Sequence, residues 1–172
     1  MTFGGRRAKA KPAPRSPQLL TDVVLFDTDT NEWVMQLGVR VKTPNKKESR
    51  WAEKARKSAE KTAIWNTCLR QLGSIDRALI EHVQFTRFSP QELDKKDNLP
   101  ASFKNVLDAL CSWIWNGPTV WKDGMVNYGK HDGWLEKTGK FTWDYNQKTY
   151  ERLQGIQVRL RLGSPPAPSR EP

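Results

Sequence analysis

Acidic side chains and a lysine gather at a predicted strand-to-helix junction in the middle of the chain. Asp94 and Asp97 stand three positions apart after a strand-like run, and Asn98 leads into the helix. Lys104 and Asp108 stand four positions apart on that helix, so they share one of its faces. Mg²⁺ takes carboxylate oxygens as ligands, and such a cation, with a lysine nearby, stabilises the charge that develops when a phosphodiester is cleaved. These residue types are therefore the ones that metal-assisted cleavage of a nucleic acid requires.

The spacing also fits a purely structural role. An Asp-x-x-Asp-Asn sequence before a helix commonly supplies a turn and an N-cap, so both interpretations of Asp94 and Asp97 stay open at this stage. His82 and His131 are isolated, and the two cysteines cannot make a zinc site alone, so zinc chemistry is not expected. Three tryptophans fit either core packing or stacking on unpaired bases: Trp113, Trp115 and Trp121.

The chain is basic, and its charge is local. It has 29 Lys and Arg against 19 Asp and Glu, a net charge of +10, which favours a polyanion partner, with DNA before a membrane surface. Residues 1–18 carry five basic side chains and no acid, and residues 42–61 carry eight basic and three acidic ones. Residues 42–61 would then form a DNA-facing side of the protein. The alternative is that they form only a solvated helix face with i,i+4 ion pairs such as Glu53 with Lys57. The candidate DNA-binding residues are Lys46, Lys47, Arg50, Lys54 and Lys57.

Hydrophobic periodicity predicts an α/β (α+β) single domain over residues 19–162, with a mixed sheet of about four strands and two main helices packed on it. A disordered basic tail (1–18) and a Pro-rich tail (163–172) are expected to flank this domain. The predicted strands are 34–41, 78–88, 141–147 and 156–162, with an extra strand at 22–26, and the predicted helices are 49–71 and 100–115.

Several protein classes are excluded on sequence grounds. No run of 18 apolar residues is present, so no transmembrane helix is expected, and the basic N-terminus lacks the apolar stretch of a secretory signal. Two cysteines cannot form a disulfide framework. We therefore expect a cytoplasmic protein that does not associate with membranes.

Several short motifs, in a fixed order, resemble the family of RusA-like Holliday junction resolvases, which occur largely in phages and prophages. The resemblance covers roughly residues 40–162. The matching motifs are Asp97-Asn98-Leu99, Phe103-Lys104, Asp108-Ala109-Leu110, Pro44-Asn45 with Arg50-Trp51, Val83–Arg87, Trp143–Gln147 and Gly155–Leu160.

This resemblance implies a Mg²⁺-dependent endonuclease, with Mn²⁺ able to substitute, that acts as a homodimer and resolves four-way DNA junctions in recombination and repair. Asp97 would be a metal ligand and catalytic, and Lys104 would assist the transition state. Lys95 stands where the family has its first aspartate, so Asp94 is the expected replacement ligand. Asp132 is preferred over Asp123 as the late metal-binding and catalytic acid. Asp108 is an additional candidate acid.

Two other functions remain open. The first is a non-catalytic protein that binds branched DNA on the same fold with a degraded metal site, a reading that Lys95 favours. The second is a basic phage protein whose partner is another protein. If the chain is phage-encoded, the expected compartment is the cytoplasm of the bacterial host.

Overall fold

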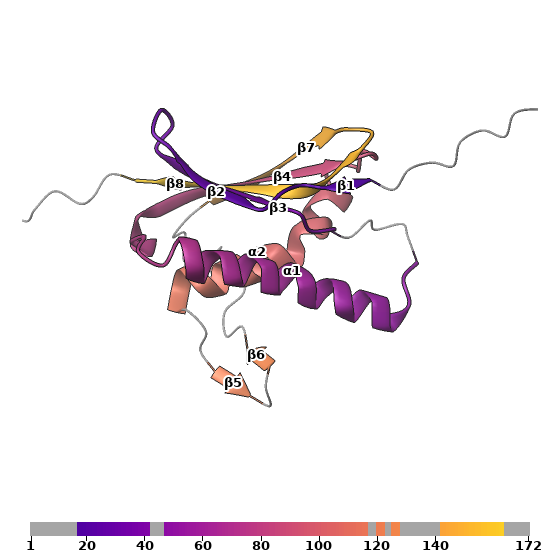
Figure 1. Cartoon of the computed structure of the whole chain (residues 1–172), viewed down its shortest axis with the longest axis horizontal. Helices are drawn as coiled ribbons and strands as arrows, with labels where there is room; N and C mark the ends of the chain where they lie inside the picture. The colour runs from indigo at the N-terminus through magenta and orange to yellow at the C-terminus, as the bar shows by residue number, and fades with distance from the viewer. Residues whose placement is uncertain (1–16, 42–46, 117–119, 123–124, 128–141, 164–172) are drawn as a thin grey trace, which may run out of the picture.

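The computed structural model describes residues 17–41, 47–116, 120–122, 125–127 and 142–163 (Figure 1). Within these ranges, one six-stranded sheet has the order β2-β3-β8-β4-β7, and β1 pairs with β8. Two short strands, β5 (Val120–Lys122) and β6 (Met125–Asn127), form a separate antiparallel pair. The strands of the main sheet are β1 (Gln18–Leu19), β2 (Val23–Asp27), β3 (Glu32–Leu37), β4 (Ile80–Ser89), β7 (Thr142–Thr149) and β8 (Leu153–Leu162).

The sheet is mixed, as predicted. β8 runs antiparallel to both β3 and β4, while β4 and β7 are parallel, with Arg87 opposite Gln147. The predicted α/β (α+β) class is therefore confirmed. The sheet has two more strands than the predicted four: β2 matches the extra strand expected at 22–26, and β1 pairs in parallel with the first two residues of β8.

Two helices cover one face of this sheet, as Figure 1 shows. α1 (Arg50–Gln71) begins where Ser49 accepts a hydrogen bond from the backbone N–H of Ala52, a typical N-cap. α2 (Asn98–Asn116) carries the apolar stripe that fills the space beneath the sheet. The rings of Phe85, Phe103 and Tyr145 pack together between α2, β4 and β7, with centroids 5.4–5.7 Å apart.

The two helices run in the same general direction. Asn105 near the middle of α2 donates a 2.8 Å hydrogen bond to Glu60 near the middle of α1. After α1 has ended, Arg77 donates a 2.7 Å hydrogen bond to the carbonyl of Trp113 near the end of α2. The beginnings of both helices therefore lie towards the same end of the molecule, which is also the end at which β4 finishes (Figure 1).

Some predicted boundaries differ from the structure. β3 ends at Leu37, before the predicted 41, because the chain after β1 crosses close to Gly38: a Cβ there would collide with the carbonyl oxygen of Leu20. The predicted tail boundary falls inside β1, since Gln18 donates to the carbonyl of Arg152 beside β8. Residues 1–16 and 164–172 lie outside the described residues. Neither described helix combines the length and apolarity needed to cross a membrane.

Candidate active site

The connection from β4 to α2 carries the two aspartates singled out from the sequence, and it gives them different roles. Asp94 is exposed, and its Oδ1 accepts hydrogen bonds from the backbone N–H groups of Lys96 at 2.8 Å and Asp97 at 3.1 Å. Its backbone carbonyl accepts from Leu99 at 2.9 Å. Asp94 therefore organises the turn that starts α2, which is the structural alternative left open by the sequence.

Asp97 is the exposed carboxylate of this turn. Its backbone carbonyl accepts from Ala101 in the first turn of α2, while its side chain makes no hydrogen bond or ion pair with any described residue. The second oxygen of Asp94, Oδ2, likewise accepts no hydrogen bond from the part of the chain that the structure describes. Two carboxylates with unused oxygens thus lie at the start of α2.

Lys104 and Asp108 lie further along the same helix. The Lys104 ammonium is 3.3 Å from Oδ1 of Asp108, and the lysine side chain is more exposed than its partner. Lys104 follows Asp97 by seven positions, or about 10 Å along a helix axis at 1.5 Å per residue. The structure therefore joins Lys104 to Asp108 directly and leaves it two turns away from Asp97, on the same helix face.

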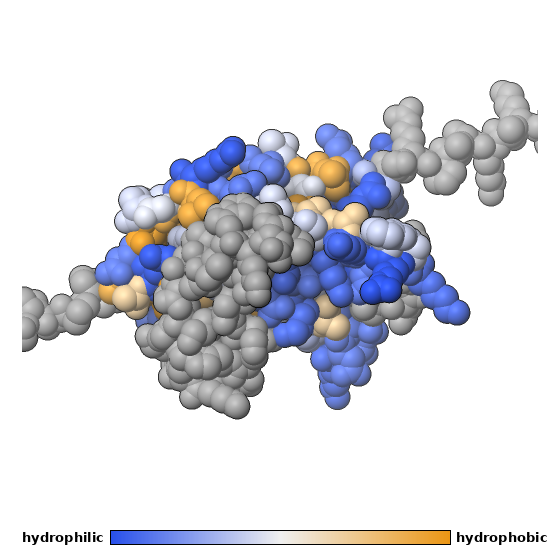
Figure 2. Space-filling model, turned by 90° about the horizontal axis from the view of Figure 1, so that it is seen from below, coloured by the Kyte–Doolittle hydropathy of each residue, from blue (hydrophilic) through white to orange (hydrophobic). Residues whose placement is uncertain are grey.

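Among the predicted DNA-binding residues, those at the start of α1 face solvent. Lys47, Arg50 and Lys54 are exposed and make no ion pair with a described residue. Lys57 differs, since its ammonium lies 2.7 Å from Glu53 one turn earlier. This is the i,i+4 ion pair expected if the segment is simply a solvated helix face. Figure 2 shows the face covered by the helices, where hydrophilic residues gather on the right, the end at which α1 begins.

One member of the basic segment turns inward, and the sequence analysis did not single it out. The Arg56 side chain is 10% exposed and ion-paired with Glu48 at 3.1 Å and with the buried Glu60 at 2.6 Å. Asn105 completes this network by donating to the other oxygen of Glu60. Burial raises the pKa of Glu60 above its usual value, although Arg56 and Asn105 pull in the opposite direction. The i,i+4 spacing of Arg56 and Glu60 was the available signal, but it does not reveal that the pair faces α2.

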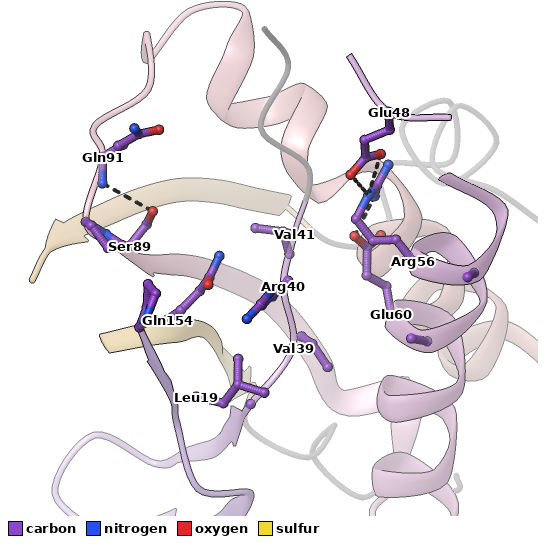
Figure 3. Close-up of a pocket in the computed structure, with 15 residues that line it drawn as sticks. Leu19, Val39, Arg40, Val41, Glu48, Arg56, Glu60, Ser89, Gln91 and Gln154 are labelled. Atoms are coloured by element: carbon purple, nitrogen blue, oxygen red, sulfur yellow. Dashed lines mark hydrogen bonds and ion pairs between the residues drawn. The ribbon is translucent and has the colours of Figure 1, made fainter. Parts of the chain in front are cut away.

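A pocket of about 1160 Å³ lies between the start of α1 and the end of β4. Glu48, Arg56 and Glu60 line one side, and Ser89 and Gln91, just before the acidic turn, line the other (Figure 3). Along the chain, the lining residue Glu48 directly follows the exposed Lys47, and the lining residue Gln91 precedes Asp94 by three positions, but the candidate cations and carboxylates do not line the pocket themselves. The cations and the carboxylates themselves lie towards the same end of the molecule, because both helices begin there (Figure 1).

The remaining predicted residues divide into two groups. Trp113 is 2% exposed and belongs to the core, which fits packing rather than base stacking. Asp123, Asp132 and Lys46 lie outside the described residues, as do the side chains of Trp115 and Trp121. In the described ranges, no three His, Cys, Asp or Glu side chains converge as the ligands of a metal do.

The carboxylates at the start of α2 are of the chemical type that a hard divalent cation takes as ligands. Mg²⁺ is usually held by one or two protein carboxylates, with water and substrate phosphate completing its coordination. Asp97 and Oδ2 of Asp94 are donors of this type and are exposed. In this arrangement Asp94 would serve the turn with one oxygen and the cation with the other.

A scan against models of protein families matches none of them, and searches of curated proteins and of solved structures likewise find no match.

Proposed function

We propose that this chain is a Mg²⁺-dependent DNA endonuclease that cuts branched DNA such as a four-way junction. The observation that carries the proposal is that exposed cations at the start of α1, which pair with no described residue, and exposed carboxylates at the start of α2 lie towards the same end of the molecule (Figure 1). Lys47, Arg50 and Lys54 would contact backbone phosphates, which supply most of the sequence-independent affinity for DNA.

The acidic turn would provide the chemistry. Asp97 and Asp94 would hold Mg²⁺, which, when bound, polarises the scissile phosphate and lowers the pKa of a bound water. Lys104 lies on the Asp97 face of α2, where its ammonium would stabilise negative charge on DNA near the site. Two symmetric cuts in one junction require two such sites, so the working form would be a homodimer with a two-fold axis.

Cleavage of a synthetic four-way junction with Mg²⁺ or Mn²⁺ tests this function. Asp97→Asn should abolish cleavage while leaving thermal stability and junction binding close to wild type, because the exposed Asp97 side chain makes no hydrogen bond or ion pair with a described residue. Asp29→Asn is the matched control: it removes the same charge from an exposed position in the β2–β3 turn, away from α2, and should cut like wild type. Equal cleavage by the wild type and Asp97→Asn would refute the proposed metal site.

A second function, junction binding without cleavage, is favoured by a specific observation. Asp94 already spends one oxygen on the turn, and Lys95 stands where the resembled family has an acid. This alternative predicts binding that weakens steeply between about 50 and 200 mM salt, with no cutting. Calorimetric titration with Mn²⁺ separates the two functions, since a degraded site would bind the ion no better than Asp97→Asn does.

A further inference from the structure

The loop between β4 and the acidic turn is held by two side chains that arise from adjacent strands. Gln147 on β7 bonds both backbone groups of Leu93: its Oε1 accepts from the N–H at 2.9 Å, and its Nε2 donates to the carbonyl at 2.7 Å. Arg87 on β4 donates from Nη1 to the carbonyl of Gln91 at 2.6 Å. Arg87 and Gln147 are register partners, so their side chains lie side by side on the same face of the sheet.

Arg87 is a costly choice for stability alone. It is 2% exposed, and among the described residues its Nε has no hydrogen-bond partner and its guanidinium makes no ion pair. Burial also lowers the pKa of its guanidinium. An uncharged side chain of similar size would avoid this desolvation. What the arginine adds is a rigid donor, aimed at the loop that leads to the acidic turn.

The hydrogen bonds continue from this loop to Asp97. Asp94 follows Leu93 directly, so fixing both backbone groups of Leu93 fixes where Asp94 begins. Oδ1 of Asp94 then holds the N–H of Asp97. Hydrogen bonds and the covalent step from Leu93 to Asp94 thus connect Gln147, half-buried on the edge strand β7, to the carboxylates at the surface, and no described bond holds these carboxylates from the solvent side.

We propose that Arg87 and Gln147 are positioning residues that hold the acidic turn in the geometry needed to bind a divalent cation. The catalytic part of this inference rests on the proposed function, whereas the placement of the turn does not. Residues that orient metal ligands from behind typically change affinity or activity about 10- to 100-fold when removed, without touching substrate.

Gln147→Ala is the main test, because Gln147 lies on an edge strand and its loss leaves the core intact. Amide exchange at Leu93 and Asp97 should rise about 10-fold or more, while β8 amides such as Val158 keep their protection, as expected for local opening. Mn²⁺ affinity and kcat should fall about 10- to 100-fold, with KM for the junction unchanged. Gln36→Ala is the control, since Gln36 also donates to a backbone carbonyl, that of Thr21, but at the other edge of the sheet.

A conservative pair tests the arginine. Arg87→Lys keeps a cationic donor and should retain more Mn²⁺ affinity and kcat than Arg87→Met, which keeps only the length. If Arg87→Met does not fold, the Mn²⁺ affinity and kcat of Arg87→Lys are compared with those of wild type and of Gln147→Ala, and this comparison tests the role of Arg87.

The outcomes separate this inference from the proposed function. Wild-type exchange at Asp97 in Gln147→Ala would overturn the positioning role, as would a freed loop with unchanged Mn²⁺ affinity and kcat. A wild-type chain that neither binds Mn²⁺ nor cuts a junction would overturn the proposed function instead. Exchange at Leu93 and Asp97 would then still show whether Gln147 holds the turn.

Discussion

Replacement of Arg56 by methionine should destabilise the fold far more than an ordinary surface change. Arg56→Met leaves Glu60, whose side chain is 1% exposed, with Asn105 as its remaining hydrogen-bond partner among the described residues. Breaking a buried ion pair from one side costs about 3–5 kcal/mol. The penalty for burying Glu60 as a charged group without Arg56 cannot exceed the free energy needed to protonate its carboxylate, because the protonated carboxyl carries no charge.

That ceiling can be worked out from the ordinary pKa of glutamate. Protonating a group with a pKa of 4.5 at pH 7 costs about 3.4 kcal/mol, at about 1.4 kcal/mol per pH unit. We therefore expect Arg56→Met to lose about 3 kcal/mol at pH 7, or roughly 6–12 °C in Tm for a domain of this size. Lys57→Met is the matched control: it removes a cation from an i,i+4 pair on the same helix, but this pair is exposed and should be worth less than about 1 kcal/mol.

The pH dependence tests the same reasoning independently. Burial raises the pKa of Glu60 in the folded state, so its contribution to stability is fully present below its unfolded pKa and is lost as the pH rises through the folded pKa. Without Arg56 that pKa should rise further. Urea unfolding at pH 7 and pH 5 should therefore show the gap between Arg56→Met and wild type narrowing on acidification. A loss no larger than that of Lys57→Met, or a gap independent of pH, would refute this account of the buried network.

Two further predictions concern stability. Phe103→Ala should lose about 3–5 kcal/mol, because its fully buried ring packs between those of Phe85 and Tyr145, and a Tm close to wild type would contradict this packing. Burial alone would raise the pKa of Glu32, but hydrogen bonds from Arg159 and Arg161 bring it below its usual value. The stability from Glu32 is therefore present above its unfolded pKa and lost as the pH falls through the folded pKa, so wild type should lose more stability than Glu32→Gln between pH 6 and pH 3 in urea titrations.

Elements with strong local patterns could be predicted from the sequence. α1 was expected from about 49 to 71 and spans Arg50–Gln71, because its apolar spacing and the N-cap at Ser49 are local signals. β8 was expected from the alternation of Ile156, Val158 and Leu160, all of which are fully buried. Such patterns depend on neighbours within a few residues, so they can be recognised without knowledge of the tertiary structure.

Features that depend on distant partners could not be predicted. β1 forms only because residues near 18 meet β8 more than 130 positions later, and two residues carry no periodicity of their own. The bonds from Gln147 to Leu93 span 54 positions. The buried Glu60, which pairs with Arg56, also accepts a hydrogen bond from Asn105 on another helix, 45 positions away. For the acidic turn, the spacing of Asp94 and Asp97 predicted the turn ahead of α2 but could not distinguish an oxygen that caps the turn from one that binds a metal.

The basic side chains of residues 42–61 do not all have the same role in the structure. Arg56 is buried in ion pairs with Glu48 and Glu60, which leaves Lys47, Arg50 and Lys54 as the exposed cations of this segment without a described ion-pair partner. Exposed carboxylates on the same side of the fold would repel phosphate and weaken a surface used only for binding DNA. A divalent cation held by Asp97 and Asp94 would reverse that local sign and attract the phosphate. In a protein that only binds DNA, the carboxylates would weaken the phosphate binding that the cations provide. In a metal-dependent nuclease, both groups would attract phosphate, and the proposed function is therefore the one that uses both.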